Sequence, residues 1–188
     1  MNKITPRILT LIAFMVLILV PVSLYATGMD KVTGFPTPES ILHDIKSRGT
    51  RSVLKDLYDN ETVWRSIMQG IAFGNESWLK VAVALRPGSD AGASEMLALA
   101  IGEALEHNSY GVLALATQSF ELSEICGGPD VDDIRYDSLE FATKAIELRI
   151  AKVASIKDSS LLTVAKMCLQ YLEDSKKDVA RFYGFHKR

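Results

Sequence analysis

The sequence has few cysteines and histidines, and it has no long apolar run after residue 26. Two cysteines in 188 residues exclude a dense disulfide scaffold, and 48% apolar with 23% charged residues exclude a disordered tail or a collagen-like fibre. The three histidines lie far apart in the sequence, and none has a second ligand at the spacing of a zinc site. We therefore expect no metal and no cofactor.

Acidic residues are densest between residues 130 and 137, where four aspartates follow a Gly-Gly-Pro segment. A calcium-binding loop would need an oxygen ligand where Ile134 stands and a glycine where Arg135 stands. We interpret this segment as a solvated loop whose acids lie at the N-terminus of the next helix, where the helix dipole favours negative charge.

Basic residues are too few over most of the chain for nucleic acid to be the main partner. Residues 27–175 contain 14 basic and 22 acidic residues, whereas residues 176–188 contain five basic residues and one acidic residue. Because phosphate binding needs clustered Lys and Arg, the acidic body argues against nucleic-acid binding. It favours a basic partner instead.

The first 26 residues have the order of a secretory signal peptide. A short basic segment through Arg7 precedes thirteen residues of apolar character, 8–20, and small residues then lead to Ala26. We expect cleavage after Ala26 and export to the periplasm or beyond, as a mature chain of about 162 residues. An uncleaved membrane anchor is the alternative, since residues 8–26 could just span a bilayer core.

Cys126 and Cys168 are expected to form one disulfide. An exported chain with an even number of cysteines meets an oxidising compartment, and two cysteines allow only one pairing. Cys168 lies on an apolar stripe of the last predicted helix, so the bridge would join the segment after one helix to the middle of another. Two buried free thiols are the alternative.

Apolar residues recur at helical spacing through most of residues 38–183, and no run alternates as a strand does. Polar caps, glycines and prolines divide this domain into seven or eight helices. The predicted helices cover residues 38–48, 50–58, 61–71, 76–85, 94–107, 109–122, 137–154 and 159–182. We expect an all-α fold of stacked antiparallel helix pairs, preceded by a linker at residues 27–37 and followed by a basic tail at residues 184–188.

A weak self-similarity at an offset of 32 residues supports helix pairs that repeat. Gly70 matches Gly102, and Ala72 matches Ala104. A period of this length in a helical chain is typical of stacked helix-turn-helix units. Chance agreement of common small residues is the alternative interpretation.

Several short segments between residues 38 and 170 resemble a group of small secreted bacterial proteins without an assigned function. The segments are Arg48-Gly49-Thr50-Arg51, Leu57-Tyr58, Trp64, Gly70-Ile71-Ala72-Phe73-Gly74, Trp78-Leu79, the run from Leu85 to Gly92, Gly102-Glu103-Ala104-Leu105, Ile125-Cys126 and Cys168. The resemblance implies a bacterial, periplasmic helical protein. It brings no activity, so it assigns no catalytic residue.

Three side chains in the middle of the chain are candidates for a site. Trp64 and Trp78 lie on adjacent predicted helices, where a groove could form, although core packing is the ordinary role of tryptophan. Glu103 follows a glycine beside a very apolar stretch, so a partly buried carboxyl group could act as an acid in a cell-envelope hydrolase. An outward-facing glutamate is the ordinary alternative.

The C-terminal end mixes basic and aromatic residues. Its candidate interaction residues are Lys176, Lys177, Arg181, Phe182 and Tyr183. Such a mixture suits an acidic partner or an anionic membrane surface. The simpler interpretation is that these cations complement the dipole at the end of the last helix.

No catalytic constellation emerges from these residues, so we expect a non-enzymatic, exported protein-interaction module. One concrete form is a periplasmic inhibitor or immunity protein, which would bind a basic partner protein with its acidic surface. The alternatives are the hydrolase that uses Glu103 and a binder of a small apolar ligand. The apolar ligand would need a dry pocket, and its expected lining is Ile71, Leu79, Leu99 and Leu113.

Overall fold

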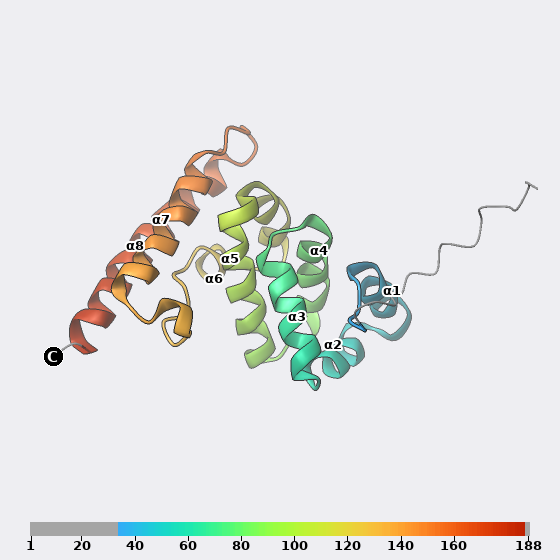
Figure 1. Cartoon of the computed structure of the whole chain (residues 1–188). Coiled ribbons are helices and arrows are strands. Elements are labelled where there is room, and N and C mark those ends of the chain that lie inside the picture. The colour runs from blue at the N-terminus through green and yellow to red at the C-terminus, as the bar shows by residue number, and fades with distance from the viewer. Residues whose placement is uncertain (1–33, 187–188) are drawn as a thin grey trace, which may run out of the picture.

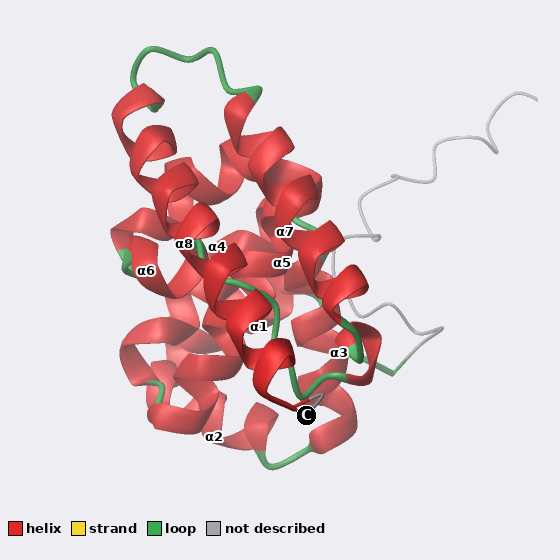
Figure 2. Cartoon of the chain, turned by 90° about the vertical axis from the view of Figure 1, so that its left-hand side faces the viewer, coloured by secondary structure: helices red, strands yellow, loops and turns green. Residues whose placement is uncertain are grey.

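The computed structural model describes residues 34–186, and all regular structure in that range is helical (Figure 1 and Figure 2). The α-helices are α1 (Pro38–Arg48), α2 (Thr50–Tyr58), α3 (Glu61–Ala72), α4 (Glu76–Leu85), α5 (Ala91–Leu115), α6 (Leu122–Ile125), α7 (Leu139–Ala154) and α8 (Leu162–His186). Three short 3-10 turns are η1 (Arg86–Gly88), η2 (Ala116–Gln118) and η3 (Ile134–Tyr136). The predicted all-α class is therefore confirmed for the described part of the chain. The expected signal segment and most of the linker lie outside it.

The helices follow one another across the molecule, from α1 at one edge to the α7–α8 pair at the other (Figure 1). Helix α5 is central, because it packs against α3, α4, α6 and α7. Its apolar residues fill the core, where Leu97, Ile101 and Leu105 are fully buried. Among residues 34–186, no helix is long and apolar enough to cross a membrane.

Polar caps set where most helices begin. The cap side chains accept a hydrogen bond from a backbone N–H of the first turn, and five of them are Thr37, Asn60, Asn75, Asp90 and Ser138. The predicted starts of the first four helices therefore agree with the structure. Helix α5 begins at Ala91, three residues before the predicted start, because Asp90 rather than a later residue is its cap.

A break in α5 lies at Asn108, between the two helices predicted there. Its backbone dihedral angles are non-helical, with φ −145° and ψ 64°. The side-chain amide donates to the carbonyl oxygen of Gly74 at 2.8 Å, and the side-chain oxygen accepts from Gly111 N–H at 2.9 Å. Gly74 has a positive φ of 71°, and an added Cβ would lie 2.9 Å from the Asn108 Cβ. This close approach holds Gly74, in the turn between α3 and α4, against Asn108 of α5.

The second half of the chain departs further from the prediction. The helix expected to reach about residue 122 ends at Leu115, and η2 and the four-residue α6 follow it. Helix α8 begins at Leu162 and continues to His186, into the segment 184–188 that was expected to be a basic tail; residues 187 and 188 lie outside the described residues. Apolar spacing identified these helices but did not locate their ends.

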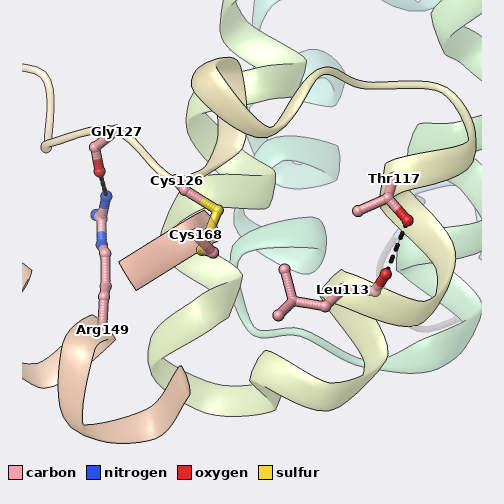
Figure 3. Close-up of a disulfide and its surroundings, with 6 residues drawn as sticks. All are labelled: Leu113, Thr117, Cys126, Gly127, Arg149 and Cys168. Carbon is pink, nitrogen blue, oxygen red and sulfur yellow. Dashed lines mark hydrogen bonds between the residues drawn. A yellow bond between two sulfur atoms is a disulfide. The ribbon is translucent and has the colours of Figure 1, made fainter. Parts of the chain in front are cut away.

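A disulfide joins Cys126, at the end of α6, to Cys168 in α8, as predicted (Figure 3). The two Cα atoms are 5.2 Å apart, and both side chains are fully buried. Helix α8 packs mainly against α7 and also against α6. The bridge therefore fixes the start of the segment that connects α6 to α7 against the second turn of α8.

Reduction of this disulfide should lower the free energy of unfolding by about 4 kcal/mol, because the bridge closes a loop across a sequence separation of 42 residues. Urea unfolding with and without reductant measures the difference. A Cys126→Ala/Cys168→Ala variant should match the reduced protein and should not respond to reductant. Equal unfolding midpoints for oxidised and reduced protein would contradict this role.

Candidate functional site

The segment between α6 and α7, residues 127–138, is the most unusual surface feature of the described chain, and we call it the acidic loop. It carries four aspartates and a single cation, Arg135. Its start is fixed by the Cys126 disulfide and its end by Ser138, which caps α7. Figure 1 shows the loop running beside the α7–α8 pair. Three further contacts hold it in one conformation.

The first contact is a buried guanidinium. Arg149 lies on the inner face of α7 with 1% of its surface exposed. Its Nε donates to Glu106 Oε1 of α5 at 3.0 Å, and its Nη1 donates to the carbonyl oxygen of Gly127 at 3.2 Å (Figure 3). A buried charge must be paired and hydrogen-bonded. Arg149 therefore joins α5, α7 and the first residue of the acidic loop.

The second contact is a three-residue ion network. The Arg135 guanidinium donates to both carboxylate oxygens of Glu103, at 3.0 and 2.6 Å, and also to Asp133 at 2.6 Å. Bidentate pairing of this kind fixes orientation as well as distance. The hydrogen bonds that Arg135 donates hold the pKa of Asp133 below its usual value, and donating to the Glu103 and Asp133 carboxylates raises the pKa of Arg135. The network ties the middle of the acidic loop to α5.

The third contact comes from the end of α8. The Tyr183 hydroxyl donates to the carbonyl oxygen of Tyr136, and both rings are buried. Burial raises the pKa of the Tyr183 phenol, so its hydroxyl remains a donor. The acidic loop is thus held from α5, α7 and α8.

Ile134 lies at the centre of the acidic loop and points into solvent, with 86% of its surface exposed. Its neighbours in the loop, Asp130, Asp132 and Asp137, are also exposed. An exposed apolar side chain on a loop that also carries exposed carboxylates can enter an apolar pocket of a basic surface.

Glu103, the predicted candidate acid, lies beside this loop. Both of its carboxylate oxygens accept hydrogen bonds from Arg135. The side chain is therefore engaged in holding the loop against α5. No group of three or more His, Cys, Asp or Glu side chains within residues 34–186 is placed to hold a metal ion.

The two tryptophans do not form an exposed groove. Trp64 is 3% exposed, with its ring edge against Tyr58 and its Nε1 donating to the Met96 sulfur at 3.2 Å. Trp78 is half-buried against the core and lies over Gly70, where an added Cβ would be 2.7 Å from the ring. The prediction of Trp64 as an interaction residue is corrected, because core packing leaves almost none of it accessible.

The candidate interaction residues near the C-terminal end contact other residues of α8 and of α7. Lys176 pairs with Glu147, Lys177 with Asp174 and Arg181 with Asp178, each at 2.6 Å. Phe182 contacts Tyr183 edge to face, with ring centroids 5.2 Å apart. Tyr183 is buried, which corrects its prediction as a surface contact. Acids of α7 and α8 therefore pair with these three cations.

The residues expected to line an apolar ligand pocket are packed in two places. Ile71, Leu79 and Leu113 have at most 1% of their surface exposed and belong to the core. Leu99 lies instead beside the start of the acidic loop, in a small cleft with Gly102 and Gly127. The four side chains do not line one pocket.

Sequence reasoning missed the three residues that define this site. Arg149 interrupts the apolar stripe of α7 formed by Ala145, Ile146 and Val153, and a lone arginine at such a position signals a buried ion pair. Ile134 is an apolar residue among charged neighbours in a loop, which is a weaker signal. Nothing local indicated that Arg135 would reach Glu103, 32 residues away.

No known protein family, curated protein or solved structure matches the chain. Function must therefore be argued from the acidic loop itself.

Substitution Arg149→Met should lower the free energy of unfolding by about 3 kcal/mol, because it leaves the Glu106 carboxylate without its cation in a largely buried position. Urea unfolding measures the loss. The double variant Arg149→Met/Glu106→Gln should recover part of it, and Arg65→Ala, which breaks an exposed helical pair, should cost less than about 1 kcal/mol. If Arg149→Met lowers the free energy of unfolding by no more than Arg65→Ala does, Arg149 does not stabilise the fold as a buried ion pair.

Substitution Arg135→Ala should raise the pKa of Asp133 toward its ordinary value, because the guanidinium donors that stabilise its carboxylate are removed. In the wild type, this carboxylate contributes stability above its unfolded pKa and loses it as the pH falls through the lower folded value. Carbon NMR titration of the Asp133 carboxyl group measures the pKa. Arg65→Ala should leave it unchanged, and an unchanged value in Arg135→Ala would show that the ion network does not form.

Proposed function

We propose that this protein is a non-enzymatic, exported protein-interaction module that binds a basic partner through the acidic loop. The observation that carries the proposal is the exposure of Ile134 at the centre of a loop held by a disulfide, a buried arginine and an ion network. One concrete form is a periplasmic inhibitor or immunity protein. In that form, residues 1–26 serve as a signal peptide, residues 27–37 as a linker and the stacked helix pairs of this small secreted bacterial protein as a scaffold.

Preorganisation supports a binding role. A flexible loop loses conformational freedom when it docks, at a cost of about 0.5–1.5 kcal/mol for each immobilised side chain. The acidic loop is already fixed by its contacts with α5, α7 and α8. The binding free energy that Ile134 contributes is therefore not offset by a cost of ordering the backbone around it.

Charge supports the choice of a basic partner. Residues 121–140 contain seven acidic residues and one basic residue, and most of the acids are exposed. Complementary charge steers association and fixes the register of docking, and added salt screens it. Ile134 is an apolar side chain among these acidic residues. It would supply the buried contact with the partner that surface charges alone do not.

The alternatives are less well supported. A cell-envelope hydrolase would need the Glu103 carboxyl group, whose oxygens accept hydrogen bonds from Arg135. A binder of a small apolar ligand would need an open space among Ile71, Leu79 and Leu113, which are packed in the core. The basic residues of α8 are paired with acids, which weakens a membrane-surface role.

The test is affinity capture, with crosslinking, from the cell envelope of the producing organism. The wild-type protein should recover a basic partner, and Ile134→Asp should weaken binding of the purified partner by about 2 kcal/mol or more, roughly thirtyfold in Kd. Binding should also weaken as salt is raised.

Phe73→Asp is the matched control, because Phe73 is 72% exposed and lies on the turn after α3, outside the acidic loop. Its binding should equal that of the wild type. Recovery of no partner, or equal loss in both variants, would contradict the proposed function.

A further inference from the structure

An open cleft lies between α2 and the turn that leads into α5. Five residues between 51 and 59 line one wall, and four residues between 88 and 93 line the other. None of them belongs to the acidic loop. The volume of the cleft is about 350 Å³, within the range of about 300–1,000 Å³ that is typical of small-molecule sites.

Two glycines bring the walls of this cleft close together. An added Cβ at Gly88 would lie 2.8 Å from Thr50 Cγ2 and 3.1 Å from the backbone nitrogen of Arg51, so η1 packs against the first turn of α2. An added Cβ at Gly92 would lie 3.1 Å from the Tyr58 hydroxyl oxygen, so this side chain reaches from α2 to the first turn of α5. The cleft is therefore formed by the packing of the fold.

The cleft has an apolar base and an aromatic wall. Leu54 and Ala93, which form the base, have 5% and 2% of their surface exposed. Tyr58 is 39% exposed, and its ring packs edge to face against Trp64. Because tyrosine combines an apolar ring with a polar hydroxyl group, this wall offers both kinds of contact to a ligand.

The polar groups of the cleft carry balanced charge. Its two cations, Arg51 and Lys55, are matched by Asp59 and Asp90, and Lys55 pairs with Asp59. Asp90 accepts from the Ala93 N–H at 3.0 Å through one carboxylate oxygen only.

Three groups in the cleft are left to bind a ligand. The Arg51 guanidinium and the Tyr58 hydroxyl have no hydrogen-bond partner among the described residues, and neither has the second oxygen of Asp90. A donor, an acceptor and a hydroxyl group that can serve as either therefore line the same cleft.

We propose that this cleft binds a neutral saccharide of one or two rings. Sugar hydroxyl groups both donate and accept, so they can pair with Arg51 and with Asp90 at once. The C–H face of a sugar ring would lie against Tyr58 and the apolar base. A simple anion would be repelled by Asp90, and a simple cation by Arg51. The inference does not depend on the proposed function.

The test is an NMR titration of the purified protein with a panel of neutral sugars: glucose, galactose, N-acetylglucosamine, maltose and lactose. We expect at least one of them to shift the backbone amide signals of residues 51–59 and 88–93 to saturation, with residues 130–137 unchanged. Absence of any shift with all five sugars would overturn the proposal. Tighter binding of inorganic phosphate or of glycylglycine at the same residues would also overturn it, by showing a site for charged ligands.

Substitutions test which side chains bind the sugar that gives the largest shifts. Tyr58→Ala and Arg51→Ala should each weaken its binding by about tenfold or more. Tyr58→Ala also removes the contact with Trp64, whereas the Arg51 side chain is exposed and its loss leaves the core intact. Arg65→Ala is the matched control, because this exposed arginine lies outside the cleft, and it should bind like the wild type. Equal affinity of Arg51→Ala and the wild type would overturn the site.

Discussion

Arg149 places a positive charge inside the packed face of α7, and the position of the acidic loop depends on how that charge is satisfied. Glu106 neutralises it, and the Gly127 carbonyl group completes part of its hydrogen bonding. Loss of either partner of a buried ion pair leaves an uncompensated charge in the interior, which is strongly destabilising. Together with the disulfide, it fixes where the chain leaves α6 and where it enters α7.

The N-terminal half of the fold followed closely from the sequence, and the reason is local. Asn60 and Asn75 cap their own helices, and Gly49 ends the first, so the information lies within one turn of each boundary. The disulfide was predictable because two cysteines allow one pairing. The break at Asn108 separates helices that apolar spacing had already distinguished.

The candidate site was not predictable, because its contacts join residues that are distant in sequence. Arg149 reaches Glu106 across 43 residues, and Arg135 reaches Glu103 across 32. Helical periodicity shows which face of a helix is buried but not which element covers it. The same limit explains the incorrect prediction that Trp64 lines a groove. Its ring packs against Tyr58, and its Nε1 donates to the Met96 sulfur.

The acidic loop presents Ile134 on a backbone that contacts from three helices hold in place. Amide nitrogen relaxation of residues 130–137 measures this most directly, because it reports backbone order before any partner is known. The contacts to Arg149, Arg135 and Tyr183 predict order parameters of about 0.85, as in a rigid helix. Values below about 0.6 would show a flexible loop and would contradict the account.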